Sequence, residues 1–471
     1  MDGSNFQTKE LGMEKTYPRS VSGVCEFIWD IEEEFDLFEQ TENGIYFWQL
    51  IRFKVYYALM QNIGIFAPAH PKPSINIKYV AKTLLNGFSS LTIKNPFFLN
   101  AEKENVVIPH QRQVNGIDIY TEEVIKSLSV DNCLILNRNW ESHSHPYAHN
   151  MGCAYITSMI NGWFRNGLRK LGLGGYSKEF HSTVKKIEEH IHLCFNIDMR
   201  LPHIALTSLQ FYETTYALYR KLFLRLKTKT LYLTTGYTQF SAIAAAQSLG
   251  INVIELQHGT FTRYHLGYSY PTQNKCIPYF ANEIRCFGHF WPETTPLPIK
   301  TEVKITGAPY IEKLSPNQKQ KVTKPKTIVF SSQGVISQYL YEFALKVAAL
   351  IPEYEIIYRL HPSENEQDFI PVKNLKNFKI STRNPNIFEL LKTTEYQAGV
   401  FSTTLLEGLA LGCKTIVINM PGIEYMYPVI EKGDALCVDT PEEFVEKIND
   451  AVMSTNMNYY YADINETMST G

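Results

Sequence analysis

The sequence predicts an α/β protein made of two doubly wound halves, with a cleft between them and a helical extension at the start of the first half. Three observations lead to this prediction. The chain has 471 residues, which is more than one ordinary hydrophobic core accommodates. Short β-branched runs alternate with helical patterns in both halves, which is typical of parallel sheets. A polar, basic segment with two prolines, residues 315–326, separates the two series and is the expected linker.

The first half is predicted to span residues 23–314, after a polar and mobile tail at residues 1–22. Its extension should hold an amphipathic helix, because apolar side chains recur at helical spacing at Phe47, Leu50, Ile51, Val55 and Leu59. An acidic run before it, from Asp30 to Glu34, is expected to be a solvated helix face.

Four strands are predicted in the first half, at residues 105–110, 132–139, 230–237 and 252–259. Between the last two lies an alanine-rich helix at 240–249 that ends at Gly250. A strand, a short helix ending in glycine and another apolar strand form a βαβ unit, which predicts a parallel sheet.

The second half is predicted to span residues 327–471. Strands are expected at residues 327–334, 354–364, 377–381, 396–402 and 414–420. The helices between and after them are expected at residues 338–349, 387–391, 404–411 and 441–452. Ligands of such sheets bind at the carboxyl ends of the strands, so the cleft between the halves is the expected site.

Composition excludes several classes of protein. The 45 Lys+Arg and 47 Asp+Glu leave a net charge of −2, which argues against a protein that coats nucleic acid. The eight cysteines form no CxxC pair, so neither a disulfide framework nor a zinc site is expected. With no apolar leader and no membrane-length apolar run, we expect a soluble, cytoplasmic chain, and contact with the inner face of a membrane stays open.

A short segment with three histidines can suggest a metal site. His143, His145 and His149 resemble such a cluster, but Pro146 breaks any helix that would align them and no acidic residue lies near. We therefore expect neither a metal nor another cofactor.

Two loops of the second half place hydroxyl groups before a helix. The first is Ser331-Ser332-Gln333-Gly334, where small residues let backbone N–H groups approach an anion. The second is Ser402-Thr403-Thr404, followed by Glu407 one turn into the helix, where it can bind ribose hydroxyls. An ordinary helix cap explains each loop singly, but not their repetition at one sheet edge.

A third loop carries a cation and an imidazole. Arg359 and His361 alternate at the end of a strand and should project to the same side, and Pro362 then ends the strand. This pair can hold a phosphate or a pyrimidine nucleotide. A strand end with a structural histidine and a surface arginine is the simpler alternative.

The best candidate in the first half is the segment Glu255-Leu256-Gln257-His258-Gly259-Thr260, at the end of the apolar strand. A neutral imidazole at His258 can take a proton from a hydroxyl group near neutral pH. Gln257 and Gly259 would then face the acceptor of that reaction. A hydrogen-bonded structural histidine is the alternative.

The order of three motifs resembles that in the GT-B glycosyltransferases of bacterial surface polysaccharides, which have two Rossmann-like domains. These motifs are His258-Gly259, Arg359-x-His361-Pro362 and Ser402-Thr403-Thr404. The layout is similar to that of the capsule and lipopolysaccharide enzymes that use CMP-activated acidic sugars, the Kdo and sialic-acid transferases. The teichoic-acid glycerophosphotransferases share it. The resemblance covers about residues 230–440.

The resemblance implies roles for individual residues. In these families the His-Pro loop binds the nucleotide phosphate or cytidine, which implies that role for His361 with Arg359 beside it. The hydroxyl-rich helix start contacts phosphate, which implies Ser402 and Thr403. The teichoic-acid enzymes have a catalytic histidine in a Trp-His-Gly motif, and this chain has Gln257 where that motif has tryptophan.

The function implied is an inverting glycosyl transfer that needs no metal. A nucleotide-activated sugar, expected to be a CMP-activated acidic sugar, would react with a glycan or lipid-linked acceptor, and nucleic acid is not an expected partner. The base would be His258 or a carboxylate such as Asp30 or Glu32. A CDP-glycerol or ribitol phosphotransferase, a nucleotide-sugar epimerase and a non-catalytic polysaccharide-binding protein stay open as alternatives.

Overall fold

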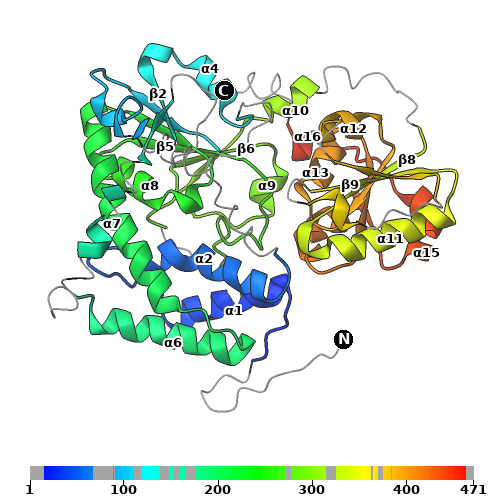
Figure 1. Ribbon diagram of the computed structural model, residues 1–471, viewed down its shortest axis with the longest axis horizontal. Helices are drawn as coiled ribbons and strands as arrows, with labels where there is room; N and C mark the ends of the chain where they lie inside the picture. The colour runs from blue at the N-terminus through cyan, green and yellow to red at the C-terminus, as the bar shows by residue number, and fades with distance from the viewer. Residues whose placement is uncertain are drawn as a thin grey trace.

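Two parallel β-sheets lie side by side in the computed structural model, one in each half of the chain (Figure 1). The structure describes residues 15–66, 88–89, 91–110, 118–137, 148–152, 156–157, 160–164, 167, 175–271, 277–314, 325–361, 364–369, 375–382 and 385–462. Every pairing between named strands is parallel. In the second sheet the central strands β8 and β11 are buried along their length, as parallel strands covered by helices on both faces are.

The first sheet has seven strands in the order β3-β2-β1-β4-β5-β6-β7. Chain order runs outward from β1 to one edge and then, from β4, outward to the other edge. This is the doubly wound order, and its direction reverses between β1 and β4. The strands are β1 (Asn105–Ile108), β2 (Cys133–Asn137), β3 (His149–Asn150), β4 (Thr230–Leu233), β5 (Asn252–Leu256), β6 (Glu283–Cys286) and β7 (Glu302–Ile305).

The second sheet repeats this winding with six strands in the order β10-β9-β8-β11-β12-β13. Its direction reverses between β8 and β11. The predicted fold class, two doubly wound parallel sheets with a helical extension, is therefore confirmed. The strands are β8 (Thr327–Ser331), β9 (Glu355–Arg359), β10 (Phe378–Ser381), β11 (Tyr396–Gly399), β12 (Lys414–Ile418) and β13 (Ala435–Val438).

Helices cover both sheets. In the first half, α1, α2 and α6 form a separate layer below the sheet in Figure 1, and α7 runs along its side. The helices of this half are α1 (Val21–Glu34), α2 (Phe47–Asn62), α4 (Glu122–Ser127), α6 (Lys178–Phe195), α7 (Leu201–Leu226), α8 (Phe240–Gln247), α9 (Phe290–Glu293) and α10 (Pro309–Leu314). Those of the second half are α11 (Ser337–Leu350), α12 (Ile387–Thr393), α13 (Thr403–Ala410), α14 (Tyr427–Glu431), α15 (Pro441–Lys447) and α16 (Met457–Tyr460).

The expected solvated face of the acidic run holds for Glu33 and Glu34, which are exposed, and is wrong for Glu32. Glu32 does not lie on a solvated helix face but is 1% exposed, because Arg52 from α2 meets it at 2.5 Å inside the helical layer. The indole of Trp48 donates a second hydrogen bond to Glu32. Asp30 accepts hydrogen bonds from Lys15 and Tyr17 instead. Glu32 therefore holds α1 against α2, and Asp30 holds Lys15 and Tyr17 against α1. Neither carboxylate lines the two cavities described below.

Residues 15–22 pack against the first half, although the sequence predicts a tail there. The ring of Tyr17 is buried edge-on against Phe27, and the Ser20 side chain caps α1 by accepting from Gly23 N. Residues 1–14 lie outside the described residues, as do most of the expected linker at 315–326 and the two histidines His143 and His145.

The helical layer connects the two halves directly. The backbone N–H of Val21 in α1 donates to the Glu424 carboxylate of the second half at 3.1 Å. The hydroxyl groups of Tyr56, in α2, and Tyr425 form a hydrogen bond. One cluster of buried apolar side chains continues from α1 and α2 into the second sheet.

The end of the chain also returns to the first half. The indole N–H of Trp291 in α9 donates to the carbonyl of Tyr460 in α16 at 2.7 Å, and Ala462 N donates to the Phe287 carbonyl at 2.8 Å. The hydroxyl of Tyr460 donates to Asp434 in the second half. The segment after α15 therefore packs against both halves.

Candidate functional site

A cavity of about 300 Å³ lies between the two halves. The first half contributes imidazole, phenol and backbone groups, and the second half contributes Thr403 and apolar side chains. Its lining residues are Phe66, His110, Tyr120, His258, Gly259, Thr260, Phe261, Thr262, His265, Phe401, Thr403, Leu406, Tyr425 and Met426. We call this the interdomain pocket.

The pocket lies where doubly wound sheets bind ligands. His110 follows β1, which borders the reversal point of the first sheet, and His258 follows β5 on the same carboxyl edge. Phe401 and Thr403 follow β11, which borders the reversal point of the second sheet. Side chains far apart in sequence therefore meet because both sheets turn their carboxyl edges toward one cavity.

His258 is connected to a buried carboxylate through a tyrosine. Its Nδ1 lies 3.3 Å from the hydroxyl of Tyr268, and that hydroxyl donates to Glu255 Oε1 at 2.6 Å. The tyrosine oxygen keeps a lone pair for an N–H at Nδ1. This arrangement favours the tautomer with an unprotonated Nε2, which is the nitrogen that can accept a proton.

The backbone of Gly236 closely approaches the Glu255 carboxylate and holds it in place. Glu255 is 1% exposed and accepts the N–H of Gly236 at 2.7 Å through the same Oε1 that Tyr268 contacts. A Cβ on Gly236 would stand 2.2 Å from Glu255 Oε2, so glycine is required there. Burial raises the pKa of Glu255 to about 7, and the two hydrogen bonds lower it less than burial raises it.

Two aromatic side chains, those of His110 and Tyr120, pack against the His258 ring. The imidazole of His110 stacks on it with ring centroids 5.0 Å apart, and Tyr120 meets both rings edge-on. Asp118 holds this loop, because it accepts the backbone N–H groups of His110 and Tyr120 and the hydroxyl of Thr121. Burial raises the pKa of Asp118 above its ordinary value.

A further imidazole, His265, closes the back of the pocket. Its ring stacks on Phe53 of α2 at 5.3 Å, and burial lowers its pKa to about 4, so it is neutral at pH 7. Its Nδ1 and the Thr262 hydroxyl have no hydrogen-bond partner in the structure and are buried. A bound ligand with polar groups can supply those partners.

The three loops of the second half meet at one edge, as the sequence predicts from the strand ends. The hydroxyl of Ser332 donates to Glu364 at 2.9 Å, which joins the loops after β8 and β9. The side-chain oxygen of Gln333 accepts the N–H of Phe401 at 2.9 Å, which joins the loops after β8 and β11. Gly334 begins the short 3₁₀ turn that leads into α11.

Arg359 and His361 stand at this edge but do not line the interdomain pocket. Arg359 Nη1 donates to the Ser381 hydroxyl at 2.9 Å and to the Pro385 carbonyl at 2.8 Å. His361 is exposed, and its backbone N–H donates to Glu364 at 2.7 Å. Pro362 lies outside the described residues.

The start of α13 reaches the pocket through Thr403. Ser402 is the helix cap, and its hydroxyl accepts the N–H of Thr404. Glu407 is 4% exposed, within the buried stripe of the helix. It is absent from the pocket lining, where the ribose interaction would need it.

Gln257 and Gly259 shape the loop that carries His258. The Gln257 side chain is 2% exposed, donates to the Gly259 carbonyl at 2.9 Å and accepts the Phe287 N–H at 2.8 Å. Gly259 lines the pocket and Gln257 lies beneath it. The glutamine therefore braces the turn after β5 and does not contact the cavity.

The sequence placed Glu255 in the candidate segment with His258 but gave it no role, and it did not identify Tyr268 or His110. Glu255 lies in β5, three residues before His258, and Tyr268 follows ten residues after His258 on a loop. A carboxylate inside an otherwise apolar strand was the available signal for Glu255. His110 ends the predicted strand 105–110 as His258 ends strand 252–259, so that shared position was the signal for His110.

Within the described ranges, no group of three His, Cys, Asp or Glu side chains is placed to hold a metal ion. In the same part of the chain, no helix is both long and apolar enough to cross a membrane.

Comparison with known proteins yields distant structural similarity. No protein-family model matches the chain, and no curated protein matches it. The glycosyltransferase SnogD from Streptomyces nogalater is 11% identical, with 79% of this chain and 96% of that chain covered and a TM-score of 0.41. The UDP-GlcNAc 2-epimerase from Methanocaldococcus jannaschii, in complex with UDP-GlcNAc and UDP, is 12% identical, with 78% and 97% covered and a TM-score of 0.44. The spinosyn rhamnosyltransferase SpnG is 11% identical, with 78% and 96% covered and a TM-score of 0.44.

Proposed function

We propose that the protein is an inverting glycosyltransferase that moves a sugar from a nucleotide-activated donor to a hydroxyl group of a glycan or lipid-linked acceptor. The observation that carries the proposal is that His258 of the first half and Thr403 of the second half line the same cavity. A donor phosphate and an acceptor hydroxyl can then meet between the two sheets, with a base on one side and phosphate ligands on the other.

The base in this proposal is His258. The contact chain from Nδ1 through Tyr268 to Glu255 supports an unprotonated Nε2, which can accept a proton. As the acceptor oxygen attacks the anomeric carbon, His258 Nε2 takes the hydroxyl proton, and the bond between that carbon and the phosphate oxygen breaks with its electron pair on the phosphate. The imidazolium formed is then stabilised through Tyr268 by the buried carboxyl.

In this proposal the sugar donor binds at the edge of the second sheet where the loops after β8, β9 and β11 meet. Thr403 and the first N–H groups of α13 can donate to the departing phosphate, and the positive end of the helix dipole opposes the charge that builds there. Arg359 and the exposed His361 would hold the remainder of the nucleotide at the mouth of the cleft. None of these steps requires a metal.

The donor assigned here is a CMP-activated acidic sugar, and this finer assignment rests on the resemblance alone. The imidazole of His110, which also lines the pocket, is compatible with it, because an imidazole N–H group can donate to a carboxylate of the sugar. CDP-glycerol turnover would instead favour a phosphotransferase. Conversion of the donor alone to an epimer would favour an epimerase.

A nucleotide panel tests the proposal. Melting temperatures are measured with CMP, CDP, UDP and GDP, and the nucleotide of the donor should stabilise the protein by about 2.7 kcal/mol at 100 times its dissociation constant. His361→Ala should weaken that nucleotide about tenfold or more while the melting temperature without ligand stays unchanged, because the imidazole is exposed.

The matched control is His203→Ala, which removes another exposed imidazole from α7 and should leave nucleotide affinity unchanged. Equal affinity of the wild type and the His361→Ala variant would reject the donor-side assignment. Failure of all four nucleotides to bind would reject the transferase.

A further inference from the structure

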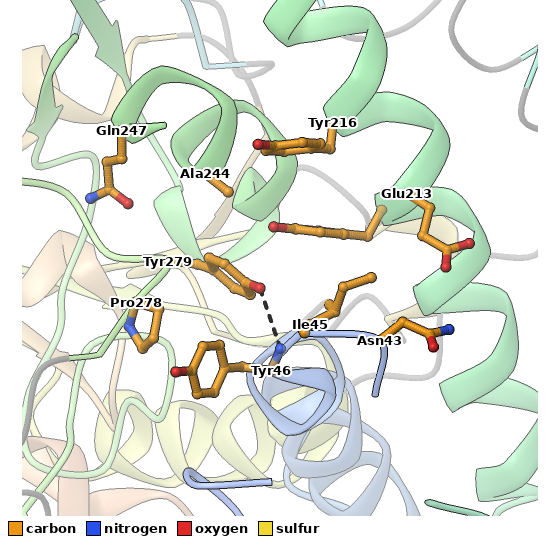
Figure 2. A pocket seen from close by; sticks show the side chains of 11 residues that line it. Asn43, Ile45, Tyr46, Glu213, Tyr216, Ala244, Gln247, Pro278 and Tyr279 are labelled. Atoms are coloured by element: carbon orange, nitrogen blue, oxygen red, sulfur yellow. Dashed lines mark hydrogen bonds between the residues drawn. The ribbon is translucent and has the colours of Figure 1, made fainter. Parts of the chain in front are cut away.

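A second cavity, of about 550 Å³, lies within the first half and shares no residue with the interdomain pocket. Four of its eleven lining residues are tyrosines: Tyr46 before α2, Tyr212 and Tyr216 on α7, and Tyr279 before β6. Figure 2 shows Tyr216, Tyr279 and Tyr46 around this one space, with Gln247 and Asn43 at its borders. We call it the tyrosine pocket.

The rings form a stepped platform. Tyr212 and Tyr216, one helical turn apart, stack with centroids 5.8 Å apart and ring planes 15° apart. Tyr279 follows Tyr212 at 5.1 Å, and Tyr46 meets Tyr279 edge-on at 6.0 Å. Of these four rings, those of Tyr212 and Tyr279 are buried. Those of Tyr46 and Tyr216 are partly exposed and offer ring surface to a ligand. Aromatic faces of this kind combine an apolar surface with a hydroxyl group.

The platform is fixed before any ligand arrives. The backbone N–H of Tyr46 donates to the Tyr279 hydroxyl at 3.3 Å, and the Tyr279 N–H donates to Gln49 at 3.2 Å. Asn43 and Gly44, both with positive φ, form the two central residues of a tight turn closed by Glu42 and Ile45. This turn holds Asn43 at the border of the pocket.

The charge of the lining favours some ligands over others. Glu213 contributes a carboxylate, Asn43 and Gln247 contribute amides, and no lysine, arginine or histidine is among the described residues that line the pocket. A phosphate or an acidic sugar would therefore meet a like charge without a cation to balance it. Amide and carboxylate oxygens instead accept hydrogen bonds from hydroxyl groups, and aromatic faces cover the C–H surface of a sugar ring.

The tyrosine pocket lies apart from the interdomain pocket, where catalysis is proposed. Tyr46 precedes the first residue of α2, whereas Phe66, four residues beyond the helix, lines the interdomain pocket. The 16 residues of α2 span about 24 Å, so one sugar unit cannot occupy both sites. The two pockets lie toward opposite ends of this helix.

We propose that the tyrosine pocket is a separate binding site for an uncharged saccharide segment. The binding itself stands on the pocket alone. Its use, to hold an acceptor chain whose growing end lies about 24 Å away in the interdomain pocket, rests on the proposed function.

The test is saturation-transfer NMR on the full chain with three uncharged probes, maltohexaose, cellohexaose and chitohexaose, and one anionic probe, an oligosialic acid. At least one uncharged probe should bind the wild type, and Tyr216→Ala should weaken it about tenfold, the effect of losing roughly 1.4 kcal/mol of ring contact. Tyr216→Phe, which keeps the ring, should bind within about threefold of the wild type.

The matched control is Tyr339→Ala, which removes a tyrosine that is 60% exposed on α11 of the second half and should leave binding unchanged. Absence of binding by all three uncharged probes, equal binding by Tyr216→Ala, or stronger binding of the anionic probe at this pocket would overturn the proposal. Nucleotide binding is measured on the same samples. A protein that binds saccharide through Tyr216 but binds no nucleotide would retain this site and lose the proposed function.

Discussion

Glu255→Gln should change how the stability of the protein depends on pH. Both donors to Glu255, Gly236 N–H and Tyr268 O–H, meet the same Oε1, and a glutamine oxygen can accept both. The substitution therefore imitates the protonated carboxyl without disturbing its contacts. It removes one titration from the buried centre of the first half.

The size of the effect follows from the pKa of Glu255, which burial raises from 4.5 to about 7. Folded protein then binds more protons than unfolded protein between these values, so this residue's contribution to stability is full below pH 4.5 and is lost as the pH rises through 7. The loss amounts to about 3 kcal/mol. Relative to the wild type, Glu255→Gln should gain that amount between pH 4 and pH 8.

His265 supplies a control of opposite sign. Burial lowers its pKa from 6.5 to about 4, so its contribution is full above pH 6.5 and is lost as the pH falls through 4. His265→Phe removes this titration and keeps a ring against Phe53. The unfolding free energy of His265→Phe minus that of the wild type should therefore fall by about 3 kcal/mol from pH 4 to pH 7.

The assay is urea unfolding of the three proteins from pH 4 to pH 8, followed by circular dichroism. Subtracting the unfolding free energy of the wild type from that of each variant at the same pH removes the contributions of all other titratable groups. Two differences of opposite slope are expected. A Glu255→Gln difference that stays constant with pH would show that this carboxyl titrates normally, and the reasoning about its burial would be refuted.

Three further substitutions test packing around the site by changes in the unfolding free energy. Gly236→Ala should cost about 2 kcal/mol or more, because its Cβ would stand 2.2 Å from Glu255, and an unchanged midpoint would contradict the close approach. Arg52→Met should cost about 3–5 kcal/mol by leaving Glu32 buried and unpaired, and Arg52→Met with Glu32→Leu should recover most of this loss. Ser402→Ala should cost about 1 kcal/mol through the lost cap of α13, whereas Ser402→Asp should not, and equal losses would contradict the cap.

The sequence predicted the fold class because its strongest patterns are local. The predicted strands 327–334 and 414–420 each contain a short apolar run, and both appear near their predicted places as β8 and β12. Strand β6 was missed because its four residues, Glu283–Cys286, alternate charged and apolar side chains in a short stretch. The burial of Glu32 was missed because its partner, Arg52, lies twenty residues away on another helix.

The site was predictable in part for the same reason. Strand ends can be read from the sequence, so His258 and the loop with Thr403 were identified as candidates, and the structure brings both to one pocket. The contacts of His258 with Tyr268 and His110 depend on how loops fold over the sheet edge. The four tyrosines of the second pocket come from three separate segments, and no local pattern connects them.

The most direct test of the central claim is the rate of the chemical step in His258→Gln under single-turnover conditions, with the donor that the nucleotide panel identifies. A general base contributes about 10²–10⁴-fold, so the account predicts sugar transfer at least about 100-fold slower than in the wild type, with donor affinity unchanged. Sugar transfer at the wild-type rate would contradict the claim that the base is the imidazole between the two halves.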